Sequence, residues 1–294
     1  MPAAHLTDRG VIRVAGADAR EFLQGVVTCD MAPVGEHQAG YGALLTPQGK
    51  IIGDFLIVAL PEADGGGFLL DTPRPLVGDL MKRLKLYKLR AKVTLDDLSE
   101  ASAVIASDDG AALPDDAGFV FADPRLPALG QRAITDAAEV GSLAAGDAER
   151  YHARRIALGV PEGGKDFVYG DVFPHEALLD QTSGVSFRKG CYVGQEVVSR
   201  MQHRGTARTR IVPVVFTEGV VPEAGIEAVA GARTLGHIGS GAGGRALAKL
   251  RLDRVADALA AGETLTAGGL AFTLEKPDFV RFPFPGEPGF GAAA

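Results

Sequence analysis

The chain has 294 residues, of which 46% are hydrophobic and 23% charged, and two cysteines. No apolar run approaches the roughly 20 residues of a membrane span, and residues 1–14 carry charges where a signal peptide would have an apolar core. Two cysteines cannot form a disulfide framework. These features argue against secreted, membrane, fibrous and disordered classes and predict a soluble cytoplasmic protein of two or three packed units.

The net charge of −7 is unevenly distributed. Residues 188–210 contain six basic residues and a single acid, and residues 82–92 contain six basic residues and no acid. Basic patches on an acidic chain favour a polyanionic ligand, although a solvated charged face remains open as an alternative for both runs.

The first half of the chain alternates between strand and helix patterns. In order, the patterns predict a strand at residues 10–14, a helix after Asp18, a hairpin of residues 41–45 and 51–60, a helix over residues 76–84 and a strand over residues 87–95. The turn Thr46-Pro47-Gln48-Gly49 fits a type I turn, and the nearly continuous apolar strand after it predicts burial on both faces. Together these elements predict an α+β unit.

The second half changes texture after residue 210. Strands near residues 119–121 and 132–135 and a helix over residues 147–158 come first, and four short strands separated by glycine-rich turns follow. That spacing predicts a small barrel or sandwich. Gly239, Gly241 and Gly244 match a dinucleotide-binding glycine pattern, but no strand-turn-helix context surrounds them, so we interpret them as a hairpin turn.

The segment from Phe187 to Gly205 holds the richest chemistry. Cys191 lies among Arg188, Lys189 and Arg200, and cationic neighbours lower the pKa of a thiol. Gly190 and Gly194 allow a close approach of the backbone to a ligand, and Gln195-Glu196 resembles the first turn of a helix. The alternative is a small buried cysteine in a turn.

The remaining candidates for a reactive or metal-binding site are weak. Cys29 has no basic neighbour in the sequence and is interpreted as structural. The six histidines form no spacing typical of a metal site, so no metal site is predicted.

Lys189-Gly190-Cys191-Tyr192-Val193-Gly194-Gln195-Glu196 matches the K-G-C-Y-x-G-Q-E motif, and with it the chain resembles the YgfZ family. These folate-binding proteins are related to the glycine cleavage T-protein, an aminomethyltransferase, and include mitochondrial iron–sulfur assembly factors. Similar blocks are found over most of the chain, at residues 18–25, 45–50, 54–55, 87–90, 159–161 and 173–176.

The resemblance implies an α+β fold with three domains in a ring. Residues 1–40 and 116–205 would form the first α+β domain, residues 41–115 the second, and residues 206–294 a C-terminal β-barrel. Tetrahydrofolate, or a polyglutamylated derivative, would occupy a central cavity that the motif cysteine faces. The implied role is assembly or repair of [4Fe–4S] enzymes, including enzymes of tRNA modification, with assembly proteins or client enzymes as partners.

The expected site combines this resemblance with the charge pattern. Cys191 is the key thiol, and Lys189 and Asp54 are the other candidate catalytic groups. Arginines and lysine of the basic segment would hold the folate tail, and the hairpin would hold the pterin. The complete expected folate site consists of Asp54, Phe55, Arg188, Lys189, Tyr192, Gly194, Gln195, Glu196, Arg200 and Arg204.

Two alternatives remain open. One is a tetrahydrofolate-dependent one-carbon transferase with Asp54 as the acid or base, but the chain has Gly53 and Ala157 where the T-protein has acidic residues. The other is an RNA-binding module, which the basic runs suggest but which their few aromatic residues disfavour.

Overall fold

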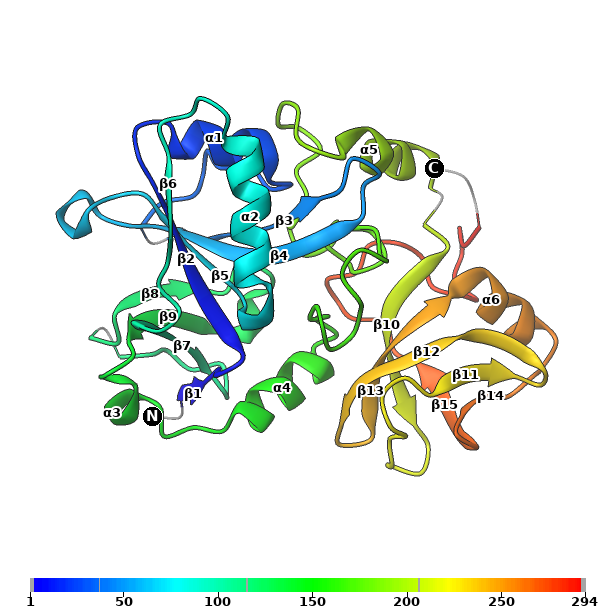
Figure 1. Ribbon diagram of the computed structural model, residues 1–294. Coiled ribbons are helices and arrows are strands. Elements are labelled where there is room, and N and C mark those ends of the chain that lie inside the picture. The colour runs from blue at the N-terminus through cyan, green and yellow to red at the C-terminus, as the bar shows by residue number, and fades with distance from the viewer. Residues whose placement is uncertain (1–2, 37, 115, 206, 292–294) are drawn as a thin grey trace. The chain divides into compact units, whose positions relative to one another are not determined.

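The structure is a computed structural model that describes residues 3–36, 38–114, 116–205 and 207–291 (Figure 1). Its helices are α1 (Ala19–Val26), α2 (Val77–Lys88), α3 (Val140–Leu143), α4 (Ala148–Ala157), α5 (Gln195–Arg204) and α6 (Leu252–Ala260). The first nine strands are β1 (Ala3–His5), β2 (Arg9–Ala15), β3 (Gly40–Leu45), β4 (Ile51–Ala59), β5 (Phe68–Pro73), β6 (Thr94–Asp97), β7 (Ser102–Ser107), β8 (Phe119–Ala122) and β9 (Gln131–Asp136). The other six are β10 (Thr209–Phe216), β11 (Glu227–Ala230), β12 (Arg233–Ala242), β13 (Arg245–Arg251), β14 (Leu265–Ala267) and β15 (Leu270–Leu274).

These elements form two compact units. The first contains residues 1–151 and 182–195, and the second contains residues 152–181 and 196–294. Strands also pair across the first predicted domain boundary, because β2 pairs with β5. This division into two compact units does not test the predicted division into three domains, which stays a prediction. Within the described residues, no helix is both long and apolar enough to cross a membrane.

The first unit contains two antiparallel sheets. One has five strands in the order β3-β4-β5-β2-β6, and the other has four in the order β1-β7-β9-β8. Helices α1 and α2 pack on one face of the five-stranded sheet, where Phe22, Phe55, Leu70 and Leu84 share one core (Figure 1). The predicted hairpin and the burial of both faces of β4 are confirmed, since every residue of β4 except Ile52 is buried.

The opposite face of the five-stranded sheet carries charge. Because side chains alternate along a strand, Arg9 of β2 and Asp71 of β5 point away from the helices. The carboxylate of Asp71 accepts from Arg9 Nε at 2.5 Å and from Arg132 Nη1 at 2.6 Å. Arg132 belongs to β9, so this pair of contacts joins the two sheets.

The same network continues to Asp123, which follows β8. Asp123 Oδ2 accepts from Arg125 Nη2 at 2.6 Å and from Arg132 Nε at 3.1 Å, and both arginines also donate to the hydroxyl of Tyr151. Burial alone would raise the pKa of Asp123, but the charges and hydrogen bonds of Arg125 and Arg132 lower it to about 2. The carboxylate of Asp123 is therefore ionised at neutral pH.

The second unit is built on a closed six-stranded barrel in the order β10-β13-β12-β11-β14-β15, which β10 closes by pairing with both β13 and β15. Alternate residues such as Val212, Val214, Ala246 and Ala248 fill its interior. The predicted barrel and the interpretation of the glycine pattern as a hairpin turn are confirmed, since Gly243 and Gly244 separate β12 from β13.

Arg155 connects the segment that holds Asp166 to the barrel strand β12. It is fully buried near the end of α4, where Nη1 donates to Asp166 at 2.7 Å and Nη2 donates to Ser240 of β12 at 3.0 Å. Nε lies 3.3 Å from Glu162, so the buried guanidinium is compensated by two carboxylates.

The predicted strand over residues 87–95 is wrong. Helix α2 continues through Lys88, an irregular loop follows, and only residues 94–97 form a strand, β6. The period-two pattern was misleading because Tyr87, Ala91 and Val93 do contact the core, whereas Leu89, at the same spacing, is 88% exposed.

The buried network predicts a large loss of stability when one of its members is removed. Replacing Arg132 with methionine removes one cationic partner from each of the buried carboxylates of Asp71 and Asp123. The free energy of unfolding should therefore fall by about 3–5 kcal/mol. Denaturant titration measures this change.

The matched control is Glu100→Ala, which breaks the exposed pair of Arg74 and Glu100. Solvent-exposed pairs contribute about 0–1 kcal/mol. Equal effects of the two substitutions would contradict the assigned role of the network.

Candidate functional site

The loop that carries Cys191 is built on the chain just after α1. Thr28 donates from its hydroxyl to the carbonyl of Gly184 at 2.5 Å and accepts from the amide of Ala43 on β3 at 2.8 Å. The amide of Ser186 donates to the Thr28 carbonyl at 2.9 Å. A short stretch beside the β3–β4 hairpin therefore holds the start of the loop.

Lys189 fixes the middle of the loop from the inside. Its Nζ donates to the carbonyls of Val27 at 2.8 Å and Cys29 at 2.7 Å, and it lies 5.4 Å from the centre of the Tyr192 ring. The side chain is buried, and burial lowers its pKa below the ordinary value. Lys189 therefore positions the loop. We predicted that its ammonium group would contact the folate tail, but that group is bound to two backbone carbonyls instead.

Gly194 fixes the far end of the loop against the hairpin turn. Its φ is +81°, and a Cβ atom there would lie 2.5 Å from the carbonyl oxygen of Thr46. That oxygen already accepts from the amide of Gly49 in the predicted turn. Only glycine fits this approach, so the glycine of the motif serves packing of the loop on the hairpin.

Cys191 stands between these two fixed points and is exposed as a free thiol. Tyr192, the next residue, is buried, and its hydroxyl has no hydrogen-bond partner among the described residues. Desolvation raises the pKa of Tyr192 to about 12. The loop thus presents a thiol to solvent beside a buried neutral phenol that keeps a donor available.

Cys29 has the opposite environment. It is 4% exposed, packs against Gly42, and burial raises its pKa to about 12. Its interpretation as structural agrees with this burial. Cys29 has no basic neighbour in the sequence, but in the fold Lys189 binds its carbonyl although 160 residues separate the two.

Asp54 and Phe55 point to opposite faces of β4. Asp54 is buried and accepts from the hydroxyl of Tyr41 at 2.9 Å, while the Tyr41 ring lies 6.0 Å from Arg125 of the ion network. Phe55 is fully buried in the core under α1 and α2. We predicted both as pterin contacts, but Phe55 belongs to the core and offers no surface to a ligand.

The other predicted residues divide between the two units. Arg188 is exposed and belongs to the first unit, whose last residue is Gln195. Glu196, Arg200 and Arg204 belong to the second unit, all exposed on α5, and Arg200 donates to Glu196 at 2.6 Å one helical turn away. Helix α5 begins at Gln195 as predicted.

Two features of this region were not predicted from the sequence. Lys189 supports the loop through contacts with a segment about 160 residues away, whereas Tyr41 reaches Asp54 across the predicted hairpin, 13 residues away. Gly53 was noted from the sequence as standing where the T-protein has an acid. In the structure position 53 faces the helices, and its Cβ position lies 3.4 Å from Leu80 of α2. A carboxylate at position 53 would be pressed into leucine side chains.

Two domain models match the chain. A GCVT N-terminal domain matches residues 5–107, and a CAF17 C-terminal beta-barrel domain matches residues 208–282. The crystal structure of glycine cleavage system aminomethyltransferase T from Bartonella henselae is similar over 95% of this chain and 86% of that one, with a TM-score of 0.74 and 16% identity. The chain thus has the aminomethyltransferase fold, with helices and antiparallel sheets followed by a C-terminal barrel, and the predicted fold class is confirmed.

The curated relatives are more specific. The iron–sulfur cluster assembly factor IBA57, mitochondrial, of Homo sapiens is 35% identical over 85% of this chain and 77% of its own length. The IBA57 homologue of Neurospora crassa is 38% identical over 74% of this chain, which spans 54% of that relative. The chain belongs to the IBA57 family of iron–sulfur cluster assembly factors, and YgfZ, the family named from its motif, is the bacterial relative.

One prediction is overturned by these relatives. We predicted a cytoplasmic protein from the composition, but the names of the Neurospora crassa, Mycosarcoma maydis and human relatives all place them in mitochondria.

The two cysteines should differ sharply in reactivity. We expect one thiol per folded chain to react rapidly with a water-soluble disulfide reagent near pH 8, because Cys191 is exposed and Cys29 is buried with a raised pKa. The second thiol should react only after unfolding in denaturant. Rapid reaction of both thiols, or a fast phase that survives Cys191→Ser, would contradict the described environments.

Proposed function

We propose that this protein supports the assembly or repair of [4Fe–4S] enzymes through the thiol of Cys191. The observation that carries the proposal is the placement of that thiol: it is exposed on a loop that Lys189 and Gly194 fix at two points. A thiol held in this way is preorganised to meet a partner without first ordering the loop.

The cysteine count limits what the thiol can do. A [4Fe–4S] cluster is commonly held by four cysteine thiolates, and this chain has one exposed thiol and one buried thiol. Any cluster that Cys191 contacts is therefore shared with a partner or passing to it. The partners in this proposal are assembly proteins or client enzymes, of the kind that the relatives' names imply.

Tetrahydrofolate binding is the second part of the proposal. The match to a GCVT N-terminal domain and the likeness to an aminomethyltransferase support it, and the free donor of the Tyr192 hydroxyl offers one polar contact in an otherwise buried setting. Asp54 with Tyr41 offers a second polar pair on the same unit. A role of the client enzymes in tRNA modification would follow from the same activity.

One-carbon transfer is the less favoured alternative. It would need Asp54 as acid or base, but the neighbouring position that is acidic in the T-protein is Gly53, packed near Leu80. The nearest atoms to the Cβ position at residue 53 all belong to leucine side chains, so a carboxylate there would meet an apolar surrounding.

The first test of the proposal is complementation. In a strain that lacks its own IBA57-type factor, the wild-type chain should restore the activity of [4Fe–4S] enzymes, and Cys191→Ser should leave that activity at the level of the empty strain. Cys29→Ala is the matched control, because it removes the buried thiol and should keep function. Full restoration by Cys191→Ser would end the proposal.

The folate part has a separate measurement. Titration calorimetry with tetrahydrofolate should show binding that weakens as salt rises, and polyglutamylated forms should bind more tightly, because Arg188 and Arg204 are exposed cations. Since exposed pairs are weak, Arg188→Ala or Arg204→Ala should each cost no more than about 1 kcal/mol.

Arg233→Ala, on the barrel strand β12, is the control and should leave binding unchanged. Equal affinity for mono- and polyglutamyl forms at two salt concentrations would show that the basic segment does not hold the folate tail.

A further inference from the structure

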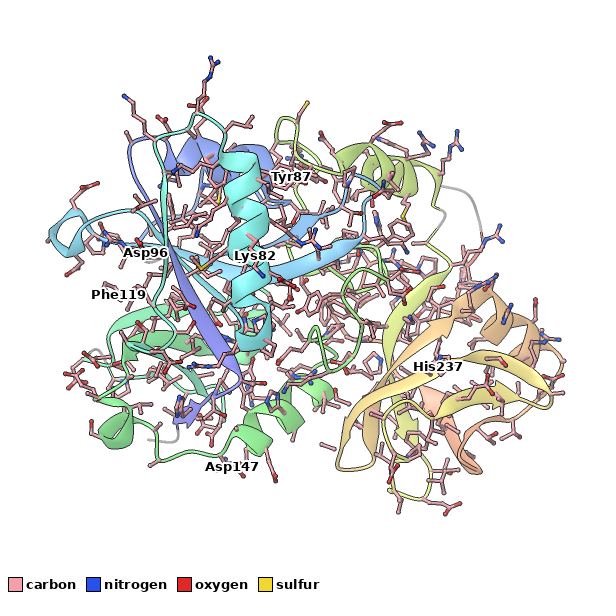
Figure 2. All side chains as sticks on the ribbon, in the orientation of Figure 1. Lys82, Tyr87, Asp96, Phe119, Asp147 and His237 are labelled. Atoms are coloured by element: carbon pink, nitrogen blue, oxygen red, sulfur yellow. The ribbon has the colours of Figure 1, made fainter. Side chains whose placement is uncertain are left out.

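The end of α2 and the loop after it, residues 86–92, form a surface that we call the α2 tip. Leu86 is 76% exposed and Leu89 is 88% exposed, the two highest values among the large hydrophobic residues that the structure describes. Single exposed leucines are common on protein surfaces, but two at the end of one helix form a small apolar knob. Figure 2 labels Tyr87, the residue after Leu86, at the upper end of α2.

The tip is held firmly at its far end. The amide of Lys92 donates to the carboxylate of Asp18 at 2.7 Å, and Gly16 approaches so closely that a Cβ there would lie 2.1 Å from the Lys92 carbonyl oxygen. Val93 is 2% exposed in the core. The two leucines are therefore exposed on a tip that is anchored to the core.

Leu89 also occupies an unfavourable backbone conformation. Its φ is 44° and its ψ is −108°, and a branched aliphatic residue at positive φ is strained. Glycine would relieve this strain, yet the chain has a leucine that makes almost no contact with its own protein. Strained residues of this kind concentrate at functional surfaces.

The chain around the knob is strongly basic, although Asp18 accepts from the Lys92 amide and Lys82 pairs with Asp79 at 3.3 Å. Six cations lie between residues 82 and 92 without an intervening acid, namely Lys82, Arg83, Lys85, Lys88, Arg90 and Lys92. Because the whole chain carries −7, the rest of it carries −13. An acidic surface would thus be attracted to the tip and to the basic run at residues 188–210, and repelled by most of the remaining acidic chain, which favours one orientation on approach.

Helix α1 links the tip to the Cys191 loop. At its start Asp18 binds Lys92, and just past its end Val27 binds Lys189. Eight residues at 1.5 Å per residue make the helix about 12 Å long. A standard interface of about 800 Å² per partner extends farther than this, so one partner can cover both features. Figure 1 shows α1 beside the upper end of α2.

We propose that the α2 tip is the docking surface for an acidic partner protein, which receives Leu86 and Leu89 in an apolar pocket and thereby lies over Cys191. The proposal rests on the proposed function, because the docked protein is the one that Cys191 serves. A protein fits better than single-stranded RNA, since the aromatic residue of the tip, Tyr87, packs partly against the core and is not free to stack on bases.

The test uses substitutions that spare the fold, in the same complementation strain. Leu89→Gly removes the knob and suits the positive φ, so its unfolding midpoint should equal or exceed that of the wild type. Lys85→Glu with Lys88→Glu reverses the charge of an exposed and a half-buried lysine near the end of α2. Both variants should lose most of the restored [4Fe–4S] enzyme activity while Cys191 keeps its rate of reaction with a small thiol reagent.

The matched controls lie on the second unit. Leu259→Ser removes another exposed leucine, on α6, and Arg233→Glu reverses an exposed cation on β12. Both should complement like the wild type. A photo-crosslinking amino acid at position 86 and a disulfide formed at Cys191 should capture the same protein, that protein should be acidic, and Lys85→Glu with Lys88→Glu should abolish its capture at position 86.

The outcomes separate the two proposals. If Cys191→Ser abolishes function and the tip variants keep it, the docking proposal falls and the proposed function stands. If Cys191→Ser keeps function, the proposed function falls. Capture of different proteins at the two positions overturns the docking proposal. So does Leu89-dependent sedimentation with phosphatidylcholine–phosphatidylglycerol vesicles in place of protein capture, because the tip would then serve a membrane.

Discussion

The buried ion network between the two sheets of the first unit is the constraint on which the rest of that unit depends. Asp71 and Asp123 bind three arginines in a layer where no member is more than 6% exposed. Such groups cost several kcal/mol each to dehydrate, so the layer is stable only when all members are in place. The network therefore specifies one alignment of β5 against β9.

That alignment reaches the Cys191 loop through the hairpin. Arg125 of the network lies near the ring of Tyr41 on β3, and Tyr41 binds Asp54 on β4. The same two strands end in the turn on which Gly194 packs. The position of the thiol is thus set by strands that are themselves held by buried charge, and Lys189 adds a brace to the chain beyond α1.

Local features could be predicted from the sequence, whereas contacts between distant segments could not. The hairpin, the barrel strands and the start of α5 follow from periodicity and turn residues within about ten positions, which is why they were found. Lys189 binds carbonyls about 160 residues away, and its charge beside Cys191 in the sequence suggested activation of the thiol instead. The error at residues 87–95 arose because helix end, loop and strand together imitate the alternation of one strand.

This chain has the aminomethyltransferase fold at 16% identity to the solved structure, and two neighbouring positions of its strand β4 have opposite surroundings. Gly53 and Asp54 are adjacent on β4, and alternation sends their side chains to opposite faces. Asp54 points into the polar layer with Tyr41, and position 53 points at Leu80 in the apolar core. Restoring an acid at position 53 would bury a carboxylate without a partner, which proteins avoid. The hairpin therefore offers a polar setting to the carboxylate of Asp54 and an apolar setting to position 53, and the exposed thiol lies on the neighbouring loop. This arrangement favours an assembly factor over a transferase.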